Sequence, residues 1–319
     1  MLAKQIIKGT LTYVPGLYKL LRRKQMGGSI SAEYCYEIWI KHLTFLRQSG
    51  LEGIPSSVAE LGPGDTIGVG LCALLSGSDR YTGLDIYPFS SVEENLKCLD
   101  ILVELFASQA PCPGPSWPDY QDYLDERSFP SHILTQEVLS NSLLPRRIRQ
   151  IRNQIEIAGD TTKRNDHSGP AISYIVPWNE KQNINPNSVD LIISHSVLEH
   201  VTDIDGTINA CNNWLRAGGW MSHQVDFTSH GQTDNWNGHW AISDFTWRLI
   251  IGRRQFLINR EPVSKIEEAL ARHDLQVMFC IQRNKPNSIK RDQLAPRFTE
   301  LSDDDFCCAE ALIQTIKKN

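Results

Sequence analysis

The alternation of short apolar runs with segments of helical spacing constrains the fold most. The expected strands are residues 57–61, 81–86, 172–176, 189–194, 220–227 and 275–282, and the expected helices between them are 66–75, 90–107, 203–215 and 263–272. Strands that alternate with helices form a mostly parallel sheet with helices on both faces. We therefore predict an α/β fold whose ligands bind beyond the carboxyl ends of the strands. Residues 306–316 fit either a final strand or a helix.

Two long connections interrupt this alternation. Residues 108–170 combine a proline-rich loop with helical spacing at 133–157, and residues 228–261 are rich in Trp, Gly, His and Asn. Structureless connections of such length are uncommon in compact domains. We therefore expect a helical lid at 108–170 and an aromatic substrate insertion at 228–261. Both belong to a domain of residues 51–319, which follows an N-terminal helical cap at 1–50.

Composition excludes several classes of protein. The 319 residues carry a net charge of −5 and are 41% hydrophobic, which is typical of a globular protein and argues against a nucleic-acid partner. No apolar run is long enough to span a membrane. Eight cysteines without a C-x-x-C motif favour reduced thiols in the cytoplasm. Residues 1–24 are basic and amphipathic, so peripheral membrane contact stays open, but Pro15 favours a segment packed on the domain.

A glycine loop follows the first expected strand. Gly62 and Gly64 allow a sharp turn and the close approach of a ligand. Asp85 ends the second strand, 23 residues after Gly62, where a carboxylate can accept both hydroxyls of a ribose. The fingerprint of a nicotinamide dinucleotide requires glycine where this chain has Ile67. Glu60 would repel a pyrophosphate, so the loop favours a nucleoside that carries positive charge.

These residues resemble a known cofactor loop. Glu60-x-Gly62-x-Gly64 is similar to the loop of class I S-adenosylmethionine (SAM)-dependent methyltransferases of the type 11-like group, and Asp85 resembles their ribose-binding acid. Residues 189–201 resemble the fourth strand and its "LEHV" helix start, and the segment Leu-Arg-Ala-Gly-Gly at 215–219 resembles the turn before strand five. The resemblance covers residues 56–107, 171–227 and 262–319.

The resemblance implies a Rossmann-like seven-stranded methyltransferase sheet of order 3-2-1-4-5-7-6, with SAM as cofactor and S-adenosylhomocysteine (SAH) as product. Trp178 follows the third strand, where this family binds adenine, and its ring is suited to cover or stack on the base, although a core position is the alternative. His195 and Ser196 end strand four, beside the reacting sulfur of this family. The expected cofactor residues are Glu60, Gly62, Pro63, Gly64, Asp85, Ile86, Trp178, His195 and Ser196.

Candidate catalytic groups follow strand five. His223, Asp226 and His230 form a His-x-x-Asp-x-x-x-His pattern, and on a regular strand 223 and 226 point to opposite faces. They converge only if the chain bends near Asp226. Two histidines and an acid also suit a metal, but this spacing disfavours one, and we expect no metal. Removal of a proton from the methyl acceptor suits histidine with a carboxylate partner. The predicted catalytic residues are His223, Asp226 and His200.

The aromatic insertion is expected to form the wall of a substrate pocket, because loops on a rigid scaffold often bind ligands. The predicted substrate residues are Glu199, His230, Trp236, His239 and Trp240. We predict methyl transfer to an oxygen or nitrogen of a small polar molecule, of the kind found in secondary metabolism. The alternatives are a nucleoside-binding protein without turnover, a protein methylase and an NAD-dependent oxidoreductase. The acceptor and the oligomeric state stay open.

Overall fold

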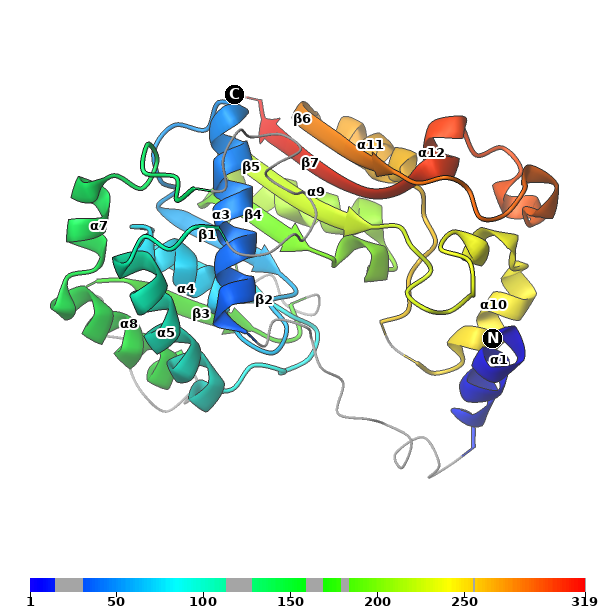
Figure 1. Cartoon of the computed structure of the whole chain (residues 1–319), viewed down its shortest axis with the longest axis horizontal. Coiled ribbons are helices and arrows are strands. Elements are labelled where there is room, and N and C mark those ends of the chain that lie inside the picture. The colour runs from blue at the N-terminus through cyan, green and yellow to red at the C-terminus, as the bar shows by residue number, and fades with distance from the viewer. Residues whose placement is uncertain (15–30, 113–127, 159–168, 179–183, 255, 319) are drawn as a thin grey trace. The chain divides into compact units, whose positions relative to one another are not determined.

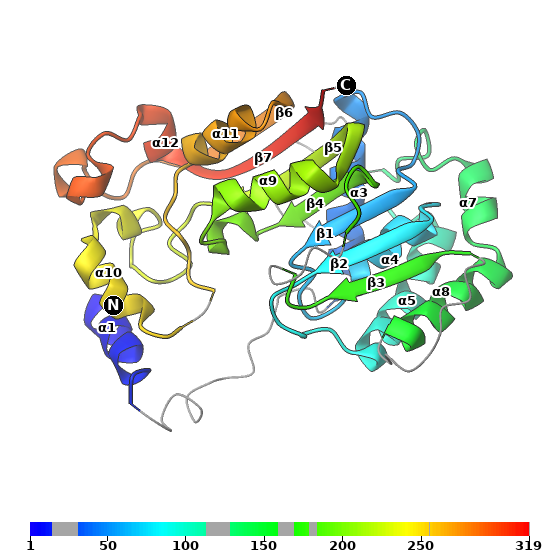
Figure 2. The ribbon, with the colours of Figure 1, turned by 180° about the vertical axis from the view of Figure 1, so that it is seen from behind.

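A seven-stranded sheet is the centre of the fold. The computed structural model describes residues 1–14, 31–112, 128–158, 169–178, 184–254 and 256–318. The strands are β1 Ser57–Leu61, β2 Arg80–Leu84, β3 Ala171–Ile175, β4 Val189–His195, β5 Leu215–Asp226, β6 Leu275–Asn284 and β7 Cys308–Lys317. Their order in the sheet is β3-β2-β1-β4-β5-β7-β6 (Figures 1 and 2). The order predicted from the sequence is therefore confirmed.

The parallel register of the first four strands places their carboxyl ends at one edge. β1 pairs in parallel with β2 and with β4, and β2 pairs in parallel with β3. All five residues of β1 are buried, as expected for a central strand of a parallel sheet. Residues that directly follow β1, β2 and β3 therefore lie close together.

Helices flank the sheet and connect its strands. The α-helices are α1 Leu2–Leu11, α3 Ala32–Gln48, α4 Gly68–Leu75, α5 Val92–Ala107, α7 Gln136–Ser142, α8 Pro145–Ala158, α9 Ile204–Trp214, α10 Asp244–Ile251, α11 Val263–Arg272 and α12 Asp303–Cys307. The 3₁₀ turns are η1 Leu198–His200, η2 Gly238–Ala241, η3 Arg291–Gln293 and η4 Pro296–Phe298. The hydroxyl of Ser31 caps α3 by accepting from the Tyr34 amide, as serine commonly does at the start of a helix.

The chain divides into two compact units. The larger unit comprises Met26–His195, Cys211–Ser222 and Gln314–Asn319, and the smaller unit comprises Met1–Gln25, Ser196–Ala210 and His223–Ile313. This division differs from the expected cap at 1–50, because α1 belongs to the smaller unit and α3 to the larger one. The expected cap is therefore not one structural element.

In the larger unit, helices α3, α4 and α5 pack against one another, and α4 packs on β1 and β2 (Figures 1 and 2). Tyr36 and Trp39 of α3 are fully buried, and the indole of Trp39 donates to the hydroxyl of Ser76 at 2.7 Å. α8, from the expected lid, packs against β3 and α5. Its contacts thus lie at the β3 side of the sheet, and its role as a lid stays a prediction.

In the smaller unit, α1 lies beside α10 (Figure 1). Gly9 makes the close approach possible, because a Cβ at this position would stand 2.0 Å from the carbonyl oxygen of Leu249. Ile6 packs against the cluster of Ile242, Trp247, Ile250 and Ile258. The first part of the basic segment 1–24 is therefore packed on its own unit, and residues 15–24 lie outside the described part.

Two local predictions differ from the structure, and a third, left open, is resolved by it. Strand five begins at Leu215 rather than at residue 220, because the chain becomes extended as soon as α9 ends at Trp214. Glu199 and His200 lie in the 3₁₀ turn η1, and the helix begins only at Ile204. The ambiguous segment 306–316 contains the end of α12 and then β7. Within the part of the chain that is described, no helix is both long and apolar enough to cross a bilayer.

Candidate functional site

The glycine loop joins the ends of β1 and β2. Gly62 and Gly64 have φ angles of 65° and 77°, in the left-handed region that favours glycine. The amide of Gly62 donates to the carbonyl oxygen of Leu84 at 2.8 Å, which ties the loop to the end of β2. Pro63 lies between the two glycines. The sequence prediction of a tight turn at this position is confirmed.

Asp85 is fixed beside this loop. Its Oδ1 accepts from the amides of Ile86 at 2.7 Å and Tyr87 at 3.2 Å, and its Oδ2 accepts from the amide of Gly64 at 3.3 Å. Burial raises the pKa of Asp85, whereas the amides of Tyr87, Ile86 and Gly64 lower it. The carboxylate is therefore held in one orientation at the carboxyl end of β2.

Glu60 lies beneath the loop rather than at its surface. Its side chain is buried, and its Oε2 accepts from the hydroxyl of Tyr81 at 2.6 Å. Burial raises the pKa of Glu60 to about 8, although the Tyr81 hydrogen bond opposes the shift and the charge of Asp85 adds to it. A ligand with positive charge near the loop would favour the ionised form.

Trp178 lies next to Asp85. Its amide donates to the carbonyl oxygen of Asp85 at 3.1 Å, and its ring meets that of Trp214 edge-on at 5.8 Å between centroids. The side chain is partly exposed. The tryptophan is thus beside the predicted ribose acid, as the motif order implies. Glu180 lies outside the described residues.

His195, at the end of β4, is backed by a buried polar chain. Its Nδ1 lies 3.4 Å from Nε2 of His42 in α3, and Nδ1 of His42 lies 2.7 Å from Oγ of Ser222. Gln314 donates to the same Oγ at 3.0 Å. Sequence reasoning missed the three residues behind His195. The sequence offers no signal for His42 beyond a histidine among the apolar residues of a helix, because no spacing rule links residues 153 positions apart.

Ser196 is the first residue of the second segment of the smaller unit, and it has a left-handed conformation with a φ angle of 54°. Its amide and hydroxyl donate to Oε1 of Gln224 at 3.1 and 2.9 Å. Gln224 in turn donates to Oε2 of Glu310 at 3.5 Å. Gln224 was also missed by the sequence analysis, because an amide in a strand gives no pattern that indicates a role.

Four predicted site residues of the smaller unit come together. Nε2 of His230 lies 3.2 Å from Oδ2 of Asp226 and 4.0 Å from Oε1 of Glu199. The rings of His200 and His230 are 5.1 Å apart between centroids. The chain bends directly after β5, where Thr228 donates to Asp226 at 2.8 Å, and this bend makes the contact possible. We call Glu199, His200, Asp226 and His230 the Glu-His cluster.

Within the Glu-His cluster Glu199 is buried, His200 and Asp226 are half-buried, and His230 is exposed. Burial raises the pKa of Glu199 well above its ordinary value, against the opposing effect of nearby main-chain amides. Burial, with the charge of His230, lowers the pKa of His200 to about 4. Burial alone would raise the pKa of Asp226, but the hydrogen bond from His230 leaves it lowered. Asp226 is therefore the carboxyl group that favours the ionised form, whereas the surroundings of Glu199 favour its neutral form.

His223 lies within strand five, as expected from the sequence. It is fully buried, and burial lowers its pKa to about 4. The histidine that pairs with Asp226 is His230, because residues 223 and 226 point to opposite faces of a strand. The catalytic role of His223 stays a prediction.

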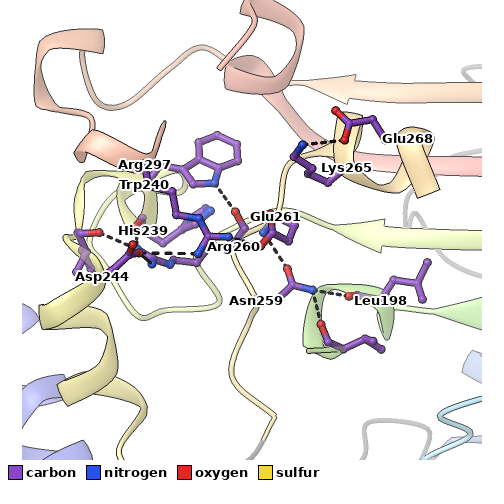
Figure 3. Close-up of polar contacts among 12 residues, drawn as sticks. Leu198, His239, Trp240, Asp244, Asn259, Arg260, Glu261, Lys265, Glu268 and Arg297 are labelled. Carbon is purple, nitrogen blue, oxygen red and sulfur yellow. Dashed lines mark hydrogen bonds and ion pairs between the residues drawn. The ribbon is translucent and has the colours of Figure 1, made fainter. Parts of the chain in front are cut away.

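A buried arginine organises the aromatic insertion (Figure 3). Arg260 donates to the carbonyl oxygen of Ile242 at 2.7 Å and stacks over the rings of Trp247 and Phe298. The indole of Trp240 donates to the carbonyl oxygen of Arg260 at 3.0 Å. Trp240 has 0% exposed surface and lies in a hydrophobic cluster. The structure thus gives Trp240 a packing role.

The other predicted substrate residues of the insertion are His239 and Trp236. His239 is buried, and burial with the charges of Arg260 and His230 lowers its pKa to about 3. Trp236 is partly exposed and donates to the carbonyl oxygen of Pro286 at 2.9 Å. Of these residues, Trp236 offers the more accessible ring.

Asn259 clamps the turn that carries Glu199 and His200 (Figure 3). Its side-chain amide donates to the carbonyl oxygens of Leu198 at 2.7 Å and Val201 at 2.8 Å. Its main-chain amide donates to the carbonyl oxygen of Glu199 at 2.6 Å. Three hydrogen bonds from one residue therefore fix the short turn η1.

Comparisons with known proteins concern mainly the fold. Residues 148–222 match the family model of a methyltransferase domain. No curated protein matches the chain. Similar solved structures include a SAM-dependent methyltransferase from Mesorhizobium loti, with 13% identity, a TM-score of 0.43, and coverage of 86% of this chain and 96% of that one.

Two further similar structures contain the cofactor or its product. Phosphoethanolamine N-methyltransferase 2 of Haemonchus contortus, in complex with SAM, has 12% identity and a TM-score of 0.41, and the alignment covers 90% of this chain and 57% of that one. Geranyl diphosphate C-methyltransferase of Streptomyces coelicolor, in complex with Mg²⁺, geranyl diphosphate and SAH, has 12% identity and a TM-score of 0.43, with coverage of 87% and 79%. Residues 148–222 are thus similar to a methyltransferase domain, and the order of the seven strands agrees with the sheet that the sequence resemblance implied.

Proposed function

We propose that the protein transfers a methyl group from SAM to an oxygen or nitrogen of a small polar molecule. The observation that carries the proposal is the carboxylate of Asp85, held by the amide of Gly64 at the carboxyl end of β2. A fixed carboxylate at this place suits the two hydroxyls of a ribose. Glu60 beneath the loop suits the positive charge of SAM and disfavours the diphosphate of NAD.

The chemistry asks mainly for positioning, since the sulfonium of SAM is already a good leaving group. In-line displacement moves the methyl carbon from sulfur to the acceptor atom, and the acceptor loses a proton. We assign proton removal to His195. With its Nδ1–H donated to Nε2 of His42, Nε2 of His195 keeps a lone pair. His42 can then donate its Nδ1–H to Ser222, which stabilises the charged ring of His195 after proton uptake.

The compartment that we propose is the cytoplasm. All eight cysteines are free thiols, and most of them are buried. Such a set suits a reducing environment. Methyl transfer from labelled SAM to acceptors in a metabolite extract distinguishes this proposal from a binding protein without turnover and from a protein methylase.

Calorimetric titration with SAM and NAD tests the cofactor. We expect SAM to bind more tightly, and Asp85→Ala to weaken SAM binding by about 1–3 kcal/mol, or roughly 5- to 150-fold, through lost charge-assisted hydrogen bonds. Asp79→Asn is the matched control, because Asp79 precedes β2 at its opposite end and accepts from Ser56. Tighter binding of NAD, or an equal effect of the two variants, contradicts the proposal.

A further inference from the structure

The Glu-His cluster has the composition of a metal site. Glu199, His200 and His230 each offer one ligand atom, and these three atoms all lie within 4.8 Å of one another. The residues come from two separate segments, the turn η1 and the bend after β5, and all lie in the smaller unit. Two imidazoles and one carboxylate are the ligand set of many zinc and iron sites with an open position.

An independent observation points to a missing ligand. Glu199 has a side chain that is only 2% exposed, and neither of its carboxylate oxygens has a hydrogen-bond partner among the residues that the structure describes. Nδ1 of His200 is likewise buried, and the described part of the chain supplies no hydrogen-bond partner for it. Buried polar groups without partners are costly, so native structures rarely keep them without a ligand, ion or water.

The surroundings support the same interpretation. Asp226 lies 3.2 Å from Nε2 of His230, the ring nitrogen that also lies 4.0 Å from Oε1 of Glu199. Asn259 holds the main chain of the turn that carries Glu199 and His200, so the backbone positions of these two residues are fixed. The cluster is thus preorganised on both of its segments.

We propose that Glu199, His200 and His230 bind a divalent transition-metal ion such as Zn²⁺. The two imidazoles disfavour Mg²⁺ and Ca²⁺, which prefer oxygen ligands. Three protein ligands leave at least one position open for water or a substrate oxygen.

Metal titration of the full chain tests the site without any activity assay. Untagged protein is stripped with a chelator and titrated with Zn²⁺ against a chromophoric competitor, and Co²⁺ is used to record visible absorption bands. We expect one ion per chain, and no comparable binding of Mg²⁺. Glu199→Gln and His230→Ala should each weaken Zn²⁺ binding more than roughly 100-fold, since partners beyond the ligands already contribute about 10–100-fold.

The controls separate loss of the site from loss of the fold. His273→Ala removes one histidine of the same unit that pairs with Asp205, and it should bind Zn²⁺ like the original chain. Without metal, Glu199→Gln should unfold at the same temperature as the original chain or higher, and Zn²⁺ should stabilise only the original chain and the control. Equal binding by all variants, or no binding by the original chain, overturns the proposal. SAM titration of the same samples reports the cofactor function separately.

Discussion

At the scale of single residues, His195 carries the most testable role. It ends β4, and three further residues of the larger unit stand behind it in a line of polar contacts. His42 is buried inside a mainly apolar helix, where a polar ring has a cost unless it is hydrogen bonded. The network explains why this histidine is tolerated there, and it makes His42 a positioning residue for His195.

We expect His195→Ala to lower kcat by about 10²–10⁴-fold, because it removes the general base. His42→Asn should lower kcat less, by roughly 10-fold, and should move the acidic limb of the pH–rate profile. The measurement is methyl transfer from labelled SAM to acceptors in a metabolite extract, and later to the purified acceptor. The exposed His132 provides the control variant His132→Ala. Full activity of His195→Ala excludes His195 as the base.

Some of the candidate site residues could be predicted from the sequence alone, and others could not. Gly62, Gly64 and Asp85 were predicted with their neighbours because local turn chemistry and strand ends determine their positions. The sequence analysis did not predict that Asp226 pairs with His230 rather than with His223, because this pairing depends on a bend after β5. His42 could not be predicted, since its contact with His195 exists only in the folded chain.

At the scale of elements, α1 and α10 show how a missing side chain determines a contact. Gly9 of α1 faces the carbonyl oxygens of Leu249 and Ile250, which a Cβ would approach to 2.0 and 2.3 Å. Main-chain carbonyl oxygens of a helix cannot move away from an added Cβ atom as the end of a flexible side chain can. The basic, amphipathic N-terminal helix is therefore matched in shape to a partner within its own unit.

Gly9→Ala should separate the two helices and destabilise the smaller unit by about 1–3 kcal/mol, the usual cost of overpacking. Hydrogen exchange and limited proteolysis of α1 measure the effect, and both should become faster. Lys8→Ala is the control, because Lys8 lies on the exposed side of the same helix. Equal exchange rates in the two variants would show that α1 does not depend on this contact.

At the scale of the whole molecule, the order of the sheet was predictable, whereas the division into units was not. Strand and helix periodicity extends along the chain and gives the elements, and the resemblance to class I methyltransferases implied the order of the strands. The two units draw on segments far apart in sequence, so α1 and α3 separate although they are neighbours in the chain. Contacts between segments that are far apart in sequence cannot be inferred from local periodicity.

The stability of the folded chain should depend on pH through Glu60. Burial raises its pKa from 4.5 to about 8, so between these values the folded state holds a proton that the unfolded state has lost. This contribution to stability therefore falls as pH rises from 4.5 to about 8, by at most about 1.4 kcal/mol per pH unit.

Glu60→Gln keeps an acceptor for Tyr81 and removes the titration. Urea unfolding of the original chain and of this variant, at several pH values between 5 and 8, measures the difference. We expect the original chain to lose stability relative to Glu60→Gln as pH increases, and to keep a constant offset from the exposed control Glu52→Gln. Parallel curves for the original chain and Glu60→Gln contradict this expectation.

Asn259 and Arg260 are adjacent, and each secures a different turn: the first holds η1, and the second holds the segment of His239 and Ile242. A deletion or insertion of one residue here would misalign both turns together. Arg260 also has a φ angle of 70°, so its backbone keeps a left-handed shape that only its surroundings maintain. Variants designed to change acceptor selectivity should therefore keep Asn259 and Arg260. Mutant libraries should vary the neighbouring turns instead.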